Sequence, residues 1–269
     1  ISEKRGTVKK NINEVKVIKD FGLEGDAHAG KWHRQVSFLS ADIVDEFNEK
    51  GASVIEGDFG ENVLVYGIDF KKLPVGTKLI CNDVKFEVTQ IGKECHSHCE
   101  IYKRVGDCIM PREGIFAKVL EGGMIKVGDK IKVIYPDKDM PYQAAVITLS
   151  DKGSRGERVD TSGPKASEIL REHGFEIIEE ILLPDEMAQI KKELIRLSDS
   201  RQVDLIITTG GTGLSPRDCT PEATLAVADR NVPGIAEAIR AGSMTITKRA
   251  MLSRGVSVIR TNTLIINLP

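Results

Sequence analysis

The chain has 269 residues, of which 41% are hydrophobic and 29% charged, and its formal net charge is −2. This length allows two domains of ordinary size, and the balanced charge argues against nucleic acid or a membrane surface as a partner. No apolar run approaches the roughly 18 residues of a membrane span, and no signal-peptide pattern is recognisable. Five cysteines, three of them within 14 residues, are more typical of a reducing cytoplasm than of a secreted disulfide framework.

Two prolines, Pro136 and Pro141, flank a polar stretch that predicts a linker between a domain at residues 1–136 and one at residues 142–269. Before this linker, short apolar runs alternate with Gly and Asn-Asp turns. Such alternation predicts a mostly β N-terminal domain, an antiparallel barrel or sandwich. The runs lie at residues 75–81, 84–89, 124–127 and 130–133.

After the linker, strand-like runs alternate with amphipathic helices. Strands are predicted at residues 144–149, 176–183 and 204–209. Helices are predicted at residues 164–173, closed by a glycine, and at residues 187–197, where apolar residues share one face. This order predicts an α/β domain with a mostly parallel sheet, which binds its ligands beyond the carboxyl ends of the strands.

The stretch from Thr208 to Ala223 is the most informative part of the sequence. Gly210, Gly211 and Gly213 lie between a strand and a helix whose predicted N-cap is Thr220. Glycines at this position let backbone N–H groups approach a ligand, so the loop predicts a phosphate or anion site. The motif matches neither a P-loop nor a dinucleotide-binding fold. The polar residues beside the glycines are Thr208, Thr209, Thr212, Ser215, Arg217 and Asp218.

Three acidic residues are predicted to surround this loop, because the carboxyl ends of parallel strands meet at one edge of the sheet. Ser150 and Asp151 follow the first strand of this domain, Asp185 follows the second, and Asp218 lies within the loop itself. Carboxylates that face a phosphate site predict Mg²⁺ between them. For Asp151 and Asp185 a helix N-cap is the alternative role.

The C-terminal half resembles the Mog-type molybdopterin-binding family of molybdenum-cofactor biosynthesis. The resemblance implies that molybdopterin and ATP react, with Mg²⁺, to give adenylylated molybdopterin and pyrophosphate. The catalytic, Mg²⁺-holding acids of the family fall on Asp185 and Asp218. The family also suggests a trimer, and a tail that continues beyond Pro269. The residues expected to bind molybdopterin and phosphate are Ser150, Asp151, Thr209, Gly210, Gly211, Thr212, Gly213, Ser215 and Arg217. The matching stretches lie at residues 149–152, 160–164, 183–186, 208–223, 227–234, 252–256 and 264–269.

The N-terminal half contains a cluster of cysteines and histidines. Cys95 and Cys99 flank His96-Ser97-His98, and Cys108 follows nine residues later. Structural zinc, buried inert thiols and a reactive thiolate activated by the histidines and Lys93 are all compatible with this pattern.

This half resembles the MOSC (molybdenum cofactor sulfurase C-terminal) domain. The family implies a β-barrel that binds molybdenum cofactor or handles sulfur through a cysteine, most naturally Cys95, with Cys99 and Cys108 as competitors. His28 and Arg34 look like residues of the family's pocket. The matching stretches lie at residues 23–28, 34–36, 57–65, 114–120 and 128–129.

Both resemblances point to molybdenum-cofactor biosynthesis. The sequence therefore predicts a molybdopterin adenylyltransferase fused to a cofactor-binding or sulfur-handling barrel. The alternative is a non-catalytic molybdopterin carrier with a zinc-stapled or structural barrel. Because Asp185 and Asp218 are both present, the enzyme is favoured.

Overall fold

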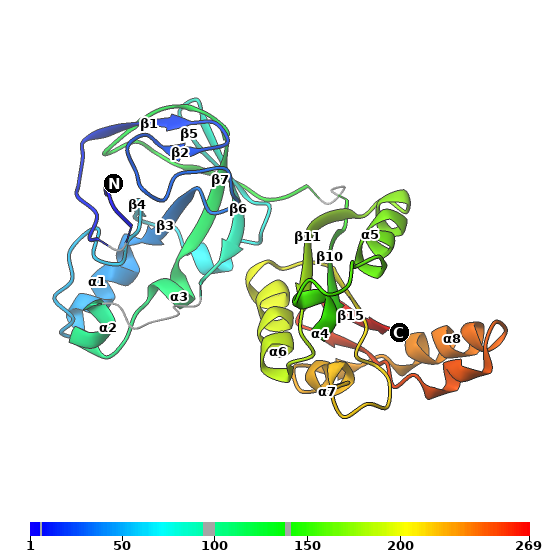
Figure 1. The fold of residues 1–269 in the computed structure, drawn as a ribbon. Coiled ribbons are helices and arrows are strands. Elements are labelled where there is room, and N and C mark those ends of the chain that lie inside the picture. Colours follow the sequence, from blue (N-terminus) through cyan, green and yellow to red (C-terminus); the bar gives the residue numbers. More distant parts are fainter. Residues whose placement is uncertain (6, 94–99, 138–140) are drawn as a thin grey trace. The chain divides into compact units, whose positions relative to one another are not determined.

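A computed structural model describes residues 1–5, 7–93, 100–137 and 141–269 (Figure 1). The chain divides into two compact units, Ile1–Lys138 and Asp139–Pro269. Each unit has its own hydrophobic core. Among the described helices, none combines the length and the apolar content that crossing a membrane requires.

The N-terminal unit is built mainly from strands, as predicted. A six-stranded sheet has the order β4-β3-β7-β6-β5-β9, and a three-stranded sheet has the order β2-β1-β8. All pairings are antiparallel except that of β3 with β4. The strands are β1 (Glu14–Ile18), β2 (Gly22–Leu23), β3 (Val36–Ser40), β4 (Val63–Val65), β5 (Lys78–Cys81), β6 (Val84–Ile91), β7 (Ile115–Glu121), β8 (Gly123–Lys126) and β9 (Lys132–Ile134). The helices are α1 (Ala41–Glu49), η1 (Phe70–Lys72), α2 (Glu100–Val105) and α3 (Met110–Glu113).

The core of this unit comes from side chains that alternate along the strands. Val84, Phe86 and Val88 of β6 are buried, as period-two alternation requires. Phe38 lies between Phe86 and Phe70, with ring centroids 5.1 and 5.8 Å away. Apolar residues of the small sheet complete the same core.

Strands β8 and β9 are consecutive in the chain but belong to different sheets. The runs at residues 124–127 and 130–133 are joined by a Gly-Asp turn but do not pair with each other. Strand β8 pairs with β1, whereas β9 pairs with β5. Asp129 explains the separation, because its carboxylate accepts hydrogen bonds from Lys126 N and Asn82 Nδ2 and ties the turn to the β5–β6 hairpin.

The C-terminal unit has the predicted mostly parallel α/β architecture. Its sheet has the order β11-β10-β12-β15-β14-β13, in which the first four strands pair in parallel and β14 pairs antiparallel with both β15 and β13. The strands are β10 (Gln143–Leu149), β11 (Glu176–Leu183), β12 (Leu205–Thr209), β13 (Arg230–Asn231), β14 (Ser257–Arg260) and β15 (Thr263–Leu268). The helices are α4 (Asp151–Ser154), α5 (Ser162–Glu172), α6 (Met187–Ile195), η2 (Arg196–Ser200), α7 (Thr220–Leu225), α8 (Pro233–Met244) and η3 (Lys248–Leu252).

Helices cover both faces of this sheet. Ile190 and Leu194 of α6 and Ala223 of α7 pack on one face, and Ala166 and Leu170 of α5 pack on the other. The sheet therefore forms the middle of three layers, and β10, β11 and β12 end at the same edge. In Figure 1, α8 and η3 project from the unit.

Helix α5 begins two residues before the predicted Pro164. The cause is Asp160, whose Oδ1 accepts hydrogen bonds from Ser162 N and Gly163 N and so satisfies the first helical donors. Gly163 fits this corner because an added Cβ would lie 2.4 Å from Thr148 Oγ1.

Candidate functional site

The glycine loop follows β12 and passes between Leu149 at the end of β10 and Thr220 at the start of α7. Gly210 and Gly211 have positive φ angles of 95° and 63°. A Cβ on Gly210 would lie 2.3 Å from Leu149 O, and one on Gly211 would lie 2.2 Å from Thr220 Oγ1 and 2.8 Å from Asp185 Oδ1. Glycine is therefore required for both conformation and space, and the loop runs directly beside the Asp185 carboxylate.

The predicted N-cap role of Thr220 is wrong. Cys219 occupies the N-cap position of α7, and Thr220 is its buried first residue. Thr220 N donates to Gly211 O (3.2 Å), and its hydroxyl donates to Gly210 O (3.1 Å). Thr220 thus holds the base of the loop against the helix.

The loop has a run of unused donors. Within the part of the chain that the structure describes, the N–H groups of Gly211, Thr212, Gly213 and Leu214 donate no hydrogen bond. Successive free N–H groups in a turn form a concave anion-binding site. Phosphate binding by this loop stays a prediction, and the unused donors are compatible with it.

Asp151 and Asp185 hold each other through the backbone. Asp151 N donates to Asp185 Oδ2, and Asp185 N donates to Asp151 Oδ1, both over 3.1 Å. Arg217 from the glycine loop binds both carboxylate oxygens of Asp151 and also reaches Glu186. The carboxyl ends of β10 and β11 and the loop after β12 are thus connected, as the parallel sheet predicts.

Asp218 stabilises the turn that contains it. Its Oδ2 accepts a hydrogen bond from Ser215 N (2.8 Å), and a Cβ on Gly213 would lie 2.9 Å from the same oxygen. Asp218 and Gly213 are therefore close, and this carboxylate borders the unused donors of the loop.

The electrostatics distinguish Asp185 from Asp151. Burial raises the pKa of Asp185, and the negative charges of Asp151 and Asp218 raise it further. Asp185 Oδ1 is buried without a hydrogen-bond partner in the described structure. In contrast, hydrogen bonds from Arg217 lower the pKa of Asp151. The negative charge of Asp185 is thus less compensated than that of Asp151.

These observations test whether a magnesium ion fits. The described residues contain no group of three or more His, Cys, Asp or Glu side chains arranged to hold a metal. However, Mg²⁺ commonly uses only one or two protein carboxylates and completes its shell with phosphate oxygens and water. The unpartnered oxygen of Asp185, near the carboxylate of Asp218, fits that second kind of site.

Three of the predicted hydroxyl side chains form hydrogen bonds within the protein. Ser150 Oγ accepts from Gly153 N at the start of α4 (3.0 Å), and Thr209 Oγ1 donates to Pro269 O (3.1 Å). Ser215 Oγ accepts from Arg217 N (3.2 Å). These side chains shape the rim of the loop. Arg254 and Glu186 also contact the site. Both lie in stretches that match the family, at residues 252–256 and 183–186, but neither was predicted as a site residue.

The predicted cysteines Cys95 and Cys99 lie outside the described residues. Cys108 is buried, and Cys81 is buried in β5, where burial raises the pKa of its thiol. Burial also raises the pKa of the Cys219 thiol.

In the N-terminal unit, three basic side chains form a cluster around two aromatic rings. The basic residues are Arg5, Arg34 and Lys93, and the rings are those of Trp32 and Phe116. The Arg34 guanidinium lies over the rings of Trp32 (4.7 Å) and Phe116 (5.7 Å). The Arg5 guanidinium lies 5.9 Å from the Trp32 ring, and Lys93 Nζ lies 5.9 Å from the Phe116 ring. Three positive charges thus gather around two aromatic side chains.

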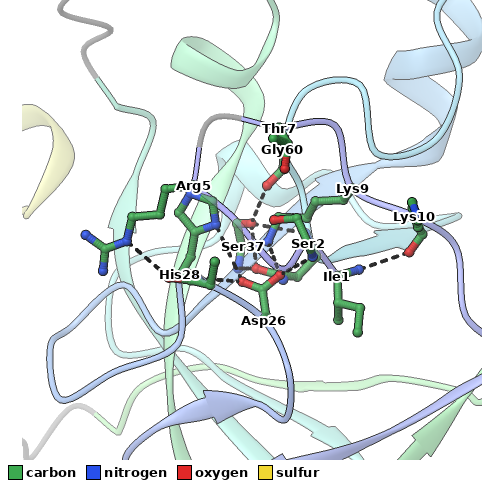
Figure 2. A network of polar contacts seen from close by, with 12 residues as sticks. Ile1, Ser2, Arg5, Thr7, Lys9, Lys10, Asp26, His28, Ser37 and Gly60 are labelled. Carbon is green, nitrogen blue, oxygen red and sulfur yellow. Dashed lines mark hydrogen bonds and ion pairs between the residues drawn. The ribbon is translucent and has the colours of Figure 1, made fainter.

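His28 connects this cluster to a buried network around Asp26 (Figure 2). His28 O accepts a hydrogen bond from Trp32 Nε1, and His28 N donates to Asp26 Oδ1. Asp26 Oδ2 accepts from Lys9 Nζ (2.7 Å) and Ser2 N (3.0 Å). Only 2% of the Lys9 side chain and 1% of the Asp26 side chain are exposed.

The C-terminal unit is therefore an α/β domain with a glycine loop and acids at the carboxyl edge of its sheet. Residues 145–269 match the family described as probable molybdopterin binding domain, and residues 25–132 match the MOSC domain. The molybdopterin adenylyltransferase of Helicobacter pylori (strain J99) is 42% identical over 126 residues, covering 46% of this chain and 72% of the relative. The chain belongs to this molybdopterin-binding family.

The molybdopterin adenylyltransferase of Escherichia coli (strain K12) is 45% identical over 127 residues. The match covers 46% of this chain and 65% of the relative, so the chain spans about two thirds of that protein's length. Among solved structures, the molybdopterin biosynthesis enzyme MoaB from Thermus thermophilus is 49% identical. That match covers 48% of this chain and 80% of MoaB, with a TM-score of 0.46.

Proposed function

We propose that the C-terminal unit transfers the adenylyl group of ATP to molybdopterin. The observation that carries this proposal is the run of unused N–H donors at residues 211–214 beside the carboxylates of Asp185 and Asp218. Phosphate oxygens require such donors. Two carboxylates able to hold Mg²⁺ favour an enzyme, because a protein that only carries molybdopterin would not need the metal ion. The names of the adenylyltransferase relatives support the same reaction.

In the proposed reaction, the terminal phosphate of molybdopterin attacks the α-phosphate of ATP. A new phosphoanhydride bond forms, the bond between the α- and β-phosphates breaks, and pyrophosphate leaves. Both substrates are anionic, so catalysis consists of positioning and charge stabilisation. The glycine loop binds one phosphate, while Arg217 offers a positive charge at the rim. Asp185 and Asp218 would hold Mg²⁺, which neutralises charge on the α-phosphate when bound.

Pyrophosphate release tests the proposal. Purified protein should release pyrophosphate from ATP when Mg²⁺ and molybdopterin are both present, and only at background level when either is omitted. A protein that binds molybdopterin but releases no pyrophosphate would instead be the carrier that the sequence leaves as the alternative.

We expect Asp185→Asn to lose turnover without losing stability. The folded protein raises the pKa of Asp185, so its contribution to stability is present below the unfolded value of 3.8 and is lost as the pH rises through the folded pKa. At pH 7 the ionised carboxylate therefore costs stability, and a neutral amide removes this cost. The midpoint of thermal unfolding at pH 7 should rise, and the difference from wild type should shrink toward pH 4.

Asp204→Asn is the matched control for this prediction. Asp204 accepts a hydrogen bond from Gln143 N at the amino end of the sheet, remote from the loop. It should leave the turnover rate unchanged within about twofold. Unchanged turnover in Asp185→Asn would contradict the role proposed for this acid.

For the N-terminal unit we propose a second function, the binding of molybdenum cofactor through its phosphate. The positive charges of Arg5, Arg34 and Lys93 around Trp32 and Phe116 favour this function, since arginine forks and aromatic faces suit a phosphate attached to a planar ring system. Sulfur handling by Cys95 or Cys99 remains a prediction, because both residues lie outside the described part of the chain.

Tryptophan fluorescence tests this second function. Trp32 is the only tryptophan of the chain, so its emission reports directly on the cluster. Molybdopterin should change this emission in a saturable manner, and Arg34→Ala should weaken the apparent affinity about tenfold. An unchanged spectrum at saturating ligand would contradict the assignment.

We also retain the predicted trimer as a proposal. Ile246, Met251 and Leu252 follow α8 and are 89%, 60% and 50% exposed, which favours a contact with a second copy of the chain. A sedimentation mass equal to the 29.5 kDa monomer would contradict it.

A further inference from the structure

Arg254 makes more contacts with the glycine loop than any role so far explains. Its Nε donates to Gly213 O (2.7 Å), its Nη2 donates to Asp218 O (2.6 Å), and its Nη1 pairs with the Glu222 carboxylate. Its backbone N–H donates to Thr212 O (2.9 Å). One residue thus holds three carbonyl groups of the loop and the helix that follows.

These contacts determine where the neighbouring N–H groups point. In a planar trans peptide the C=O of one residue and the N–H of the next point in opposite directions, and the described chain has no cis peptide bonds. The carbonyls of Thr212 and Gly213 are held toward Arg254. The N–H groups of Gly213 and Leu214 are therefore directed away from it, and these are two of the unused donors.

We propose that Arg254 is the positioning residue of the phosphate cradle, an inference that rests on the proposed function. By holding the carbonyls on one side, it presets the N–H donors on the other before the phosphate arrives. Donors arranged in advance stabilise developing charge without reorganisation during the reaction. Through Asp218 O, the same guanidinium also restricts the backbone of a proposed Mg²⁺-holding acid.

Only an arginine can make this set of contacts. Its planar fork offers several donors in fixed directions, whereas a lysine offers a single ammonium that cannot reach two carbonyls and a carboxylate together. Arg240 Nη1 donates to Gly255 O (2.7 Å), so the residue next to Arg254 is anchored as well. The backbone that carries the Arg254 side chain is therefore held in place as well.

The test compares Arg254→Lys with Arg260→Lys in the complete chain. Arg260 is a matched control because it binds the Asp199 carboxylate and Val227 O, the same kinds of partner, without touching the loop. Both variants should shift the midpoint of thermal unfolding by similar amounts. Only Arg254→Lys should lower kcat of adenylyl transfer, by about 10- to 100-fold, while KM for molybdopterin changes less than threefold.

Binding of inorganic pyrophosphate, followed by titration calorimetry, is the second readout and does not depend on turnover. Arg254→Lys should weaken it about tenfold and Arg260→Lys should not. If Arg254→Lys does not fold, Glu222→Gln, which removes the charge that orients the guanidinium, should change both readouts in the same direction by about threefold.

The outcomes separate this inference from the proposed function. A wild-type protein that binds pyrophosphate in an Arg254-dependent way but transfers no adenylyl group would overturn the function alone. An active wild type whose Arg254→Lys and Arg260→Lys variants behave alike would overturn the role of Arg254. Absence of pyrophosphate binding in wild type would also overturn it, because there would be no cradle to position.

Discussion

Asp218→Asn is expected to lower the rate of adenylyl transfer by about 10²-fold or more while the fold stays intact. The amide has the shape of the carboxylate, and its oxygen can still accept the hydrogen bond from Ser215 N. The variant therefore removes the charge and keeps the turn. Initial rates of pyrophosphate release, at saturating ATP and molybdopterin, measure the effect.

Two further measurements make this prediction specific. Molybdopterin should bind to Asp218→Asn with nearly the affinity of wild type, because the amide keeps the shape of the carboxylate. The double variant with Asp185→Asn should lose far less than the product of the two single losses, since both acids act on one metal ion. Full activity in folded Asp218→Asn, or strictly multiplicative losses, would contradict a shared site.

The largest loss of stability is expected from Asp26→Asn in the N-terminal unit. This change leaves the ammonium group of Lys9 buried without its counter-charge, which costs about 3–5 kcal/mol when one partner of a buried pair is removed. Urea unfolding followed by Trp32 fluorescence measures this unit selectively, because Trp32 is the only tryptophan. Asp107→Asn, which breaks an exposed pair with Arg112, should cost less than about 1 kcal/mol.

The Asp26 prediction also has a pH dependence. Burial opposes ionisation, but hydrogen bonds from His28 and Lys9 outweigh it, and the pKa of Asp26 falls below its unfolded value of 3.8. A depressed folded pKa contributes stability that is present above 3.8 and is lost as the pH falls through the folded value. The difference between wild type and Asp26→Asn should therefore shrink below pH 4. A constant difference from pH 7 to pH 3 would mean that the charge of Asp26 does not carry the effect.

The sheet of the C-terminal unit could be predicted because its signals are local and agree. Short apolar runs mark β10, β11 and β12, and the helical pattern between them allows only a parallel connection. Once these strands are parallel, Asp151, Asp185 and the glycine loop must meet at one edge. The convergence of these groups thus followed from topology, without any contact being known.

Contacts between side chains and distant carbonyls could not be predicted in this way. Arg254 lies 36 residues from Asp218 and contacts its backbone, and no sequence spacing encodes such a bond. Thr220 shows that a contact between residues close in the sequence can also be mispredicted. A threonine before proline is typical of an N-cap, but the loop carbonyl of Gly210 offered its hydroxyl another partner.

The N-terminal unit was predictable only in its strand content. Lys9 and Asp26 look like surface charges in the sequence, since neither belongs to a periodic pattern, yet both are buried. The pairing of β8 with β1 and of β9 with β5 depends on contacts far apart in the chain.

The most direct test of the account is to look for the product itself. Purified protein, in excess over molybdopterin and with α-labelled ATP and Mg²⁺, should convert molybdopterin in a single turnover into a species that carries the labelled adenylyl group. Mass spectrometry should find the added AMP on the terminal phosphate, and Asp218→Asn should form it at least about 10²-fold more slowly. Bound but unmodified molybdopterin, with all label remaining in ATP, would contradict the proposed adenylyl transfer.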